Sequence, residues 1–219
     1  MEHFREELDE LNKQLLEMSC LVVDSITQSV SAVVNRDGEA ASVVFQNENK
    51  INQLEIQIDN LAFQLLALQQ PVAVDLRFVT MSMKINNNLE RMGDIAVNIA
   101  QRALSLLSIE RVTPKVDIPY MAQLAQDMIT DSINAFVQRD SELAEAVLKS
   151  DDAVDNMRDR MYNDALKFME ADPHMIHPGI DYIFIARGLE RLADHSTNIA
   201  EDVLFFVRGI DVRHHAAQI

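Results

Sequence analysis

The stretch of sequence that decides the fold occurs twice, 100 residues apart. Its first copy reads Leu89-Glu-Arg-Met-Gly-Asp-Ile-Ala-Val-Asn-Ile-Ala-Gln-Arg-Ala-Leu104, and its second copy reads Leu189-Glu-Arg-Leu-Ala-Asp-His-Ser-Thr-Asn-Ile-Ala-Glu-Asp-Val-Leu204. Eight of the sixteen positions are identical, and they include Glu, Arg, Asp and Asn, which a shared apolar pattern alone would not place in one register. The chain therefore contains an internal repeat.

The spacing of apolar residues around these copies predicts long helices. In the first copy and the residues before it, apolar side chains recur at alternating steps of four and three, as in a helix packed in a bundle: Ile85, Leu89, Met92, Ala96, Ile99, Ala103 and Leu106. Turn signals divide the chain into six predicted helices, at residues 3–35, 39–70, 73–108, 119–138, 141–171 and 179–209. We expect an all-α fold of two tandem three-helix bundles, at 1–110 and 119–219, joined by a linker at 111–118.

Composition excludes several classes of protein. The 219 residues contain 19 Lys and Arg against 35 Asp and Glu, so the net charge of −16 would repel nucleic acid. Five Gly, five Pro and no Trp exclude a β-sandwich, whose turns recur every few residues. No apolar run approaches the roughly 18 residues that cross a membrane, and the acidic start is unlike a secretory signal. We expect a cytoplasmic protein in which the single cysteine, Cys20, is a buried apolar residue.

Each repeat copy carries a stripe of polar side chains. Glu90, Asp94 and Asn98 are spaced by four residues on the third predicted helix, and the sixth carries Glu190, Asp194 and Asn198. In an antiparallel helical hairpin, residues equidistant from the turn face each other. A turn at Pro71 brings Glu48 opposite Asp94 and Asn52 opposite Glu90; a turn at Asp172–Pro173 brings Asp151 opposite Asp194 and Asp155 opposite Glu190.

Clustered carboxylates repel one another and need compensation, for which the sequence leaves two alternatives. A cation with a preference for oxygen ligands can lie among them, or they can be solvated and paired with Arg and Lys. The Glu-x-x-His motif of di-iron oxidases is missing from the predicted helices, with its only analogue at Asp211–His214 in the tail. For His195, solvation or hydrogen bonding to a neighbour is the favoured interpretation over metal ligation. Glycine-rich phosphate loops, nucleophile elbows and paired cysteines are also missing, so we expect no enzymatic activity.

Three segments, at 68–77, 89–100 and 185–200, closely resemble the PhoU family, the accessory proteins of bacterial phosphate-specific transport systems. The resemblance implies acidic metal-binding patches on the second and third helices of each repeat, with iron or zinc; magnesium and manganese also suit such oxygen ligands. The matching positions are Glu48, Glu90, Asp94, Asn98, Asp151, Asp155, Glu190, Asp194 and Asn198. Asn52 stands where the family favours an acid, which predicts a weaker site in the first repeat.

The function that the resemblance implies is regulation of phosphate uptake and signalling. Such a protein links the ATPase subunit of a phosphate ABC transporter to a phosphate-sensing histidine kinase and negatively controls the phosphate-starvation response. We expect a homodimer, recruited to the inner face of the membrane by partners whose basic patches meet its acidic surface, without direct membrane insertion. The alternative is a carboxylate-patch metal-binding protein with storage or metalloenzyme activity.

Overall fold

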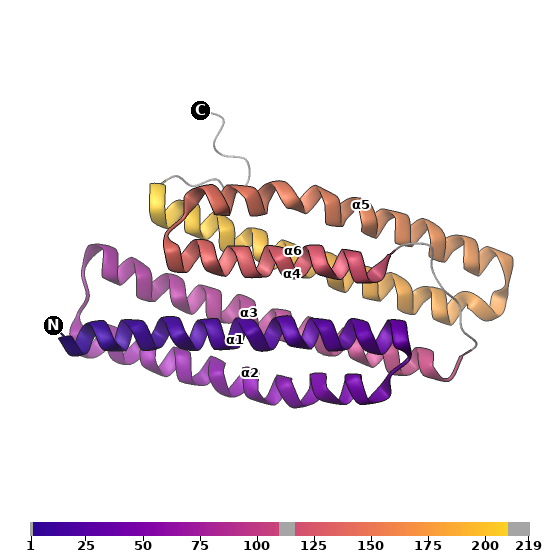
Figure 1. The fold of residues 1–219 in the computed structure, drawn as a ribbon, viewed down its shortest axis with the longest axis horizontal. Coiled ribbons are helices and arrows are strands. Elements are labelled where there is room, and N and C mark those ends of the chain that lie inside the picture. The colour runs from indigo at the N-terminus through magenta and orange to yellow at the C-terminus, as the bar shows by residue number, and fades with distance from the viewer. Residues whose placement is uncertain (1, 110–116, 210–219) are drawn as a thin grey trace.

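The computed structural model describes residues 2–109 and 117–209, and these residues form helices and turns without a single strand (Figure 1). The six long helices are α1 (Glu2–Asn35), α2 (Gly38–Gln64), α3 (Ala73–Leu107), α4 (Ile118–Gln138), α5 (Ser141–Ala171) and α6 (Ile176–Arg208). A short π-helix, η1 (Leu65–Gln69), follows α2, and a 3₁₀ turn, η2 (Pro173–Met175), precedes α6. The all-α prediction is confirmed. Among the described residues, no helix combines the length and apolar character that crossing a bilayer requires.

Two local predictions are wrong, each because of helix geometry. The sixth helix begins at Ile176 rather than at 179, since Pro178 lies in its first turn, where a missing backbone N–H needs no partner. Cys20 is exposed, because α1 turns Leu15 and Val22 inward and places Cys20 on the opposite face, one turn after the exposed Leu16.

The two repeats share their local structure as well as their sequence. Arg36 and Arg139 adopt left-handed backbone angles, with φ of 57° and 56°, and the next residue in each case, Asp37 or Asp140, caps the following helix. The distance along the chain from this capping aspartate to the first residue of the Leu-Glu-Arg motif is 52 positions in the first repeat and 49 in the second. The difference falls in the connection between helices, which is longer at η1 than at η2. Positions that face each other across the two hairpins therefore remain equivalent.

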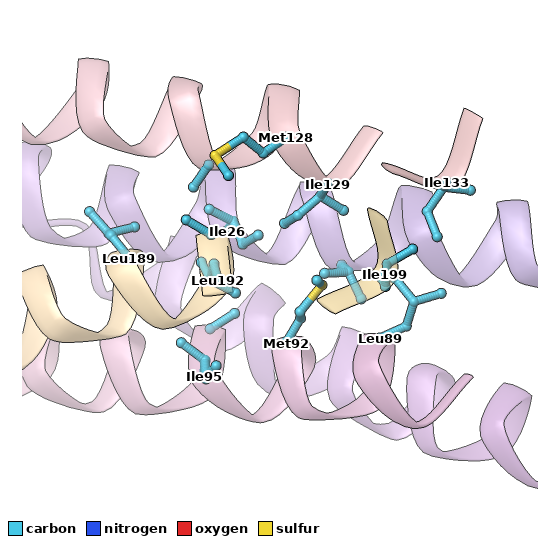
Figure 2. Close-up of a cluster of buried hydrophobic side chains, with 14 of the residues drawn as sticks. Ile26, Leu89, Met92, Ile95, Met128, Ile129, Ile133, Leu189, Leu192 and Ile199 are labelled. Carbon is cyan, nitrogen blue, oxygen red and sulfur yellow. The ribbon is translucent and has the colours of Figure 1, made fainter. Parts of the chain in front are cut away.

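The two three-helix units share one hydrophobic core. Helices α1, α3, α4 and α6 pack together in the middle, while α2 covers α1 and α3 on one side and α5 covers α4 and α6 on the other (Figure 1). The buried side chains between the units come from all four central helices (Figure 2); they include Ile26, Leu89, Met92, Ile95, Met128, Ile129, Leu189, Leu192 and Ile199. The Phe78 ring of α3 stacks on Phe136 of α4, with centroids 5.1 Å apart. Burying each large apolar side chain contributes about 1.5–3 kcal/mol, so the side chains buried between the units add to the stability of both.

The third helices of the two repeats run antiparallel along the centre. Lys84 of α3 pairs with Asp202 of α6 at 2.9 Å, and Arg102 of α3 pairs with Asp181 of α6 at 3.3 Å. The residue numbers rise along one helix as they fall along the other, which is the arrangement of a twofold axis relating the two repeats. We call this contact the α3–α6 seam. Along it, residues of α3 can be compared with the equivalent residues of α6.

Candidate functional site

The second unit brings its predicted carboxylates together where α5 lies against α6. Asp151 and Asp155 come from α5, and Glu190 and Asp194 come from α6. The pKa of Asp151 is raised from 3.8 to about 6, first by burial and then by the charges of Asp155, Asp194, Asp152 and Glu190. These carboxylates of α5 and α6 are therefore near enough for their charges to repel one another.

One guanidinium lies among these carboxylates. Arg158 Nη1 donates to Asp155 Oδ1 at 2.7 Å and to Glu190 Oε1 at 2.5 Å, so it joins α5 to α6. The Arg158 side chain is 22% exposed and that of Glu190 is 16% exposed, which shields the pair from water. The pKa of Glu190 is still raised, because burial and the nearby Asp194 outweigh Arg158. Arginine pairing, the second of the two compensations considered, therefore operates in this unit.

The first unit has a different arrangement between α2 and α3. Burial raises the pKa of Glu90, and repulsion from Asp94 and then from Glu55 raises it further. Glu55 and Arg158 occupy the same position of the repeat, 103 residues apart, as do Asp37 and Asp140. Glu48 is half-buried and Asn52 is exposed, and within the described part of the chain no hydrogen bond or ion pair joins either to α3. An acid thus stands where the second unit has its cation.

The two asparagines of the stripes lie away from the carboxylates. Asn98 and Asn198 line cavities at the α3–α6 seam, and Asn98 Nδ2 donates to the Asp94 backbone carbonyl at 2.9 Å. The cause is helical phase, because eight residues at 100° each turn a side chain about 80° beyond two full turns. A four-residue spacing keeps neighbours on one face only over short distances.

His195 contacts the other repeat rather than the carboxylates. Its Nδ1 lies 2.8 Å from Asn88 Oδ1 on α3, which agrees with the hydrogen-bonded interpretation. Its pKa is lowered, first by burial and then by the charges of Arg191 and Arg91. The Asp211–His214 segment lies outside the described residues.

The fit of a metal to these patches can be judged from the side chains. Across residues 2–109 and 117–209, no three His, Cys, Asp or Glu side chains are grouped closely enough to hold an ion as they stand. In the second unit Arg158 engages Asp155 and Glu190, which leaves Asp151 and Asp194 as the carboxylates without a guanidinium between them. The oxygen donors suit a hard cation, but binding requires these side chains to draw together.

Two residues that shape the patches were missed by the mirror register. Arg158 follows Asp155 by three residues on the same face, and Glu55 follows Asn52 in the same way. A comparison of the second and fifth helices at a 103-residue offset would have found both. This offset of 103 residues differs from the 100 residues that align the third and sixth helices.

The architecture is that of a helical protein built from two repeated three-helix units. In each unit acidic side chains lie where the second helix packs against the third, and we call these two contacts, α2–α3 and α5–α6, the acidic seams. A family model described as the PhoU domain matches residues 15–103 and again 118–203. The chain belongs to the PhoU family.

The comparisons cover almost the whole chain. A phosphate-specific transport system accessory protein PhoU homolog of Caulobacter vibrioides is 34% identical over 94% of this chain and 90% of its own length. A homolog of the same name from Pseudomonas aeruginosa is 35% identical over 97% of this chain and 88% of its own. The crystal structure of PhoU from Pseudomonas aeruginosa aligns with a TM-score of 0.90 at 33% identity, covering 94% of this chain and 100% of that one. A phosphate transport system regulatory protein PhoU from Streptococcus pneumoniae aligns with a TM-score of 0.87 at 30% identity, over 95% and 99%.

Proposed function

We propose that this chain is an accessory protein of a phosphate transport system that regulates phosphate uptake. It contacts the ATPase subunit of a phosphate ABC transporter and a phosphate-sensing histidine kinase, and it keeps the phosphate-starvation response off when phosphate is plentiful. The observation that carries the proposal is the match of both repeats to the PhoU family, together with relatives named as accessory and regulatory proteins of phosphate transport.

The surface chemistry supports docking on proteins with basic patches. The chain has a net charge of −16, and Asp94 and Asp194, one from each acidic seam, are exposed. Complementary charge accelerates association and selects partners, and it is screened by salt. Such contacts would hold the protein at the inner face of the membrane through its partners, with no insertion of its own.

The regulatory proposal is tested by co-purification and by deletion of the gene. The tagged full-length protein should retain both the transporter ATPase and the kinase from phosphate-replete cells, and retention should weaken as salt rises. Deletion should switch on the starvation response despite ample phosphate. If neither partner is retained and the response stays repressed, the proposal is wrong.

A second copy of the chain is a further partner that we propose. Apolar side chains at the connection between α2 and α3 are exposed, among them Phe63, Leu68 and Val72, of which Leu68 is 76% exposed. Exposed apolar groups of this kind favour association. Light scattering on the purified protein should give twice the chain mass of 24.8 kDa, and Leu68→Ser with Val72→Ser should shift it toward the monomer. A monomeric wild type would contradict the homodimer.

The raised pKa of Asp151 favours a second function, the binding of a metal ion in the α5–α6 patch. Asp151 and Asp194 would hold iron, zinc, magnesium or manganese, and Asp155 and Glu190 could join them once released from Arg158. In the first unit the ligands would be Glu48, Glu90 and Asp94. The ion would supply the positive charge that relieves the repulsion among the carboxylates.

Metal analysis with a matched pair of variants tests this function. We expect the purified protein to bind Mn²⁺, and Asp151→Asn with Asp194→Asn to lower the bound metal. The control is Asp127→Asn with Asp131→Asn, which removes the same charge from an acidic pair on α4. Equal metal content in all three proteins would exclude the patch, whereas phosphatase or oxidase turnover by the metal-loaded protein would support the metalloenzyme alternative.

A further inference from the structure

Two cavities lie at equivalent places along the α3–α6 seam. One, of about 360 Å³, is the basic pocket, lined by Asn98, Arg102, Phe184, Arg187, Gly188 and Arg191. The other, of about 480 Å³, is the twin pocket, lined by Lys84, Asn87, Asn88, Asn198, Glu201 and Asp202. A shift of 100 residues converts most positions of one pocket into those of the other. The repeat therefore supplies an internal control for the chemistry of each.

The pockets have opposite charge. In the twin pocket, Lys84 is neutralised by Asp202 at 2.9 Å. The equivalents of these two residues in the basic pocket are Phe184 and Arg102, and Arg187 replaces Asn87. The basic pocket therefore gathers three arginines in a chain whose net charge is −16. Such a concentration of positive charge is unexpected from composition alone.

Two of these arginines have no counter-ion in contact within residues 2–109 and 117–209. Both Arg187 and Arg191 are exposed, and among the described residues no carboxylate oxygen lies within 4.0 Å of their side-chain nitrogens. Repulsion between like charges is tolerated most easily where an anion is bound. The charge of Arg191 acts on Asp194 from a distance, but the N–H groups of both arginines are available for a ligand.

The third arginine is held in place. Arg102 Nη1 donates to Asp181 Oδ1 at 3.3 Å, and Ser105 Oγ donates to the other Asp181 oxygen at 2.9 Å. Asp181 is only 4% exposed, and the Arg102 guanidinium carbon lies 4.5 Å above the Phe184 ring centroid. Asp181 thus occupies one edge of the Arg102 guanidinium and Phe184 covers one face, while the other N–H groups remain for a ligand. A donor positioned in advance loses less entropy on binding.

Part of the lining of the basic pocket is apolar and tightly packed. Gly188 allows α6 to approach α3 closely, since a Cβ atom there would lie 3.0 Å from Ile99 Cγ1. Ile95 and Ile99, both buried, line the pocket together with the arginines. Charged hydrogen bonds beside such a surface are stronger than in open water.

We infer that the basic pocket binds the phosphoryl group of a small anion, either inorganic phosphate or a phosphorylated metabolite. The planar guanidinium matches the oxygens of phosphate with paired N–H donors. A phosphoryl group carries about 1.5 to 2 negative charges near neutral pH, which balances three arginines of which one is shared with Asp181. The inference is independent of the acidic seams and of partner docking, so either can fail without the other.

Calorimetric titration of the purified full-length chain tests the site, with inorganic phosphate in one arm and ATP in the other. We expect saturable binding of one anion per chain at low ionic strength. Arg187→Gln with Arg191→Gln should weaken it at least tenfold, since a hydrogen bond to a charged group contributes on the order of a tenfold change in affinity. Arg187→Lys with Arg191→Lys keeps the charge but loses the paired donors, so its affinity should be intermediate.

The control variant is Arg77→Gln with Lys84→Gln, which removes the same charge from exposed positions of α3, including one in the twin pocket. It should bind as the wild type does. Binding of phosphate itself identifies a site for the free ion, and binding of ATP alone identifies a site for phosphorylated ligands. The inference is overturned if neither anion binds saturably, if the Arg187 and Arg191 variant binds like the wild type, or if the control loses as much affinity.

Discussion

The α2–α3 and α5–α6 seams are copies of one hairpin with opposite chemistry at one position. In the second seam Arg158 bridges Asp155 and Glu190, whereas in the first Glu55 stands at that position and adds to the repulsion on Glu90. The left-handed arginine and the aspartate cap that begin each hairpin are the same, whereas the connections at η1 and η2 differ. Duplication has therefore preserved what the core requires while the surface charge of the two copies diverged.

The largest effect is expected from removing the bridge in the second seam. Arg158→Ala should lower the free energy of unfolding at pH 7 by about 2 kcal/mol, because it leaves Glu190 with little solvent and no cation. Urea denaturation in the presence of a chelator measures the change. Arg160→Ala, an exposed cation on the same helix, should cost less than about 0.5 kcal/mol. Equal losses in the two variants would mean that the bridge contributes nothing specific.

The pH dependence of stability sharpens the same comparison. Asp151 has a folded-state pKa of about 6 against 3.8, so between these values the folded protein holds more protons than the unfolded chain. Its contribution makes stability fall as pH rises from about 4 to 6, and the penalty is complete above 6.

Asp151→Asn should therefore raise the free energy of unfolding by about 1 kcal/mol at pH 7.5, after allowance for solvent screening of this partly exposed group. The gain should vanish below pH 4, where the carboxyl is protonated in both states. Denaturation curves at the two pH values measure it. A gain that is the same at both would assign the effect to something other than titration.

A smaller effect is expected from giving the first seam the chemistry of the second. Glu55→Arg should add about 0.5 to 1 kcal/mol to the free energy of unfolding and lower the pKa of Glu90, since a cation replaces a repelling acid. Glu55→Gln should achieve part of this. NMR titration of the Glu90 carboxyl provides the direct measurement, and an unchanged pKa in the Arg variant would show that the two seams differ in geometry as well as in charge.

The smallest effect concerns the ion pair of the twin pocket. Lys84→Gln should cost less than about 0.5 kcal/mol, because the lysine side chain is 52% exposed and exposed pairs contribute little. Thermal unfolding would show a shift of a degree or two at most. A larger loss of stability would mean that the Lys84–Asp202 pair, rather than the shared core, holds α3 and α6 together at this part of the α3–α6 seam.

The sequence predicts most of the fold because apolar periodicity and helix caps are local signals. The helices, the repeat and the pairing of α5 with α6 across Asp172 all follow from them. Other features depend on helical phase. Asn98 and Asn198 come eight residues after Glu90 and Glu190 and therefore lie on another face of their helices. Cys20 comes only two residues after the buried Met18 and is therefore exposed to solvent. Predicting the pairing of Arg158 with Glu190 requires aligning the second and fifth helices at an offset of 103 residues. The motif copies, which are 100 residues apart, do not reveal this offset.

The shared core has a consequence for the origin of the chain. A single three-helix unit would leave the inner faces of its first and third helices, including Ile26 and Met92, open to water. An ancestral polypeptide of half this length could hide those faces by pairing with an identical molecule. Fusion of two such genes then fixes the partner permanently and frees each half to acquire its own charges.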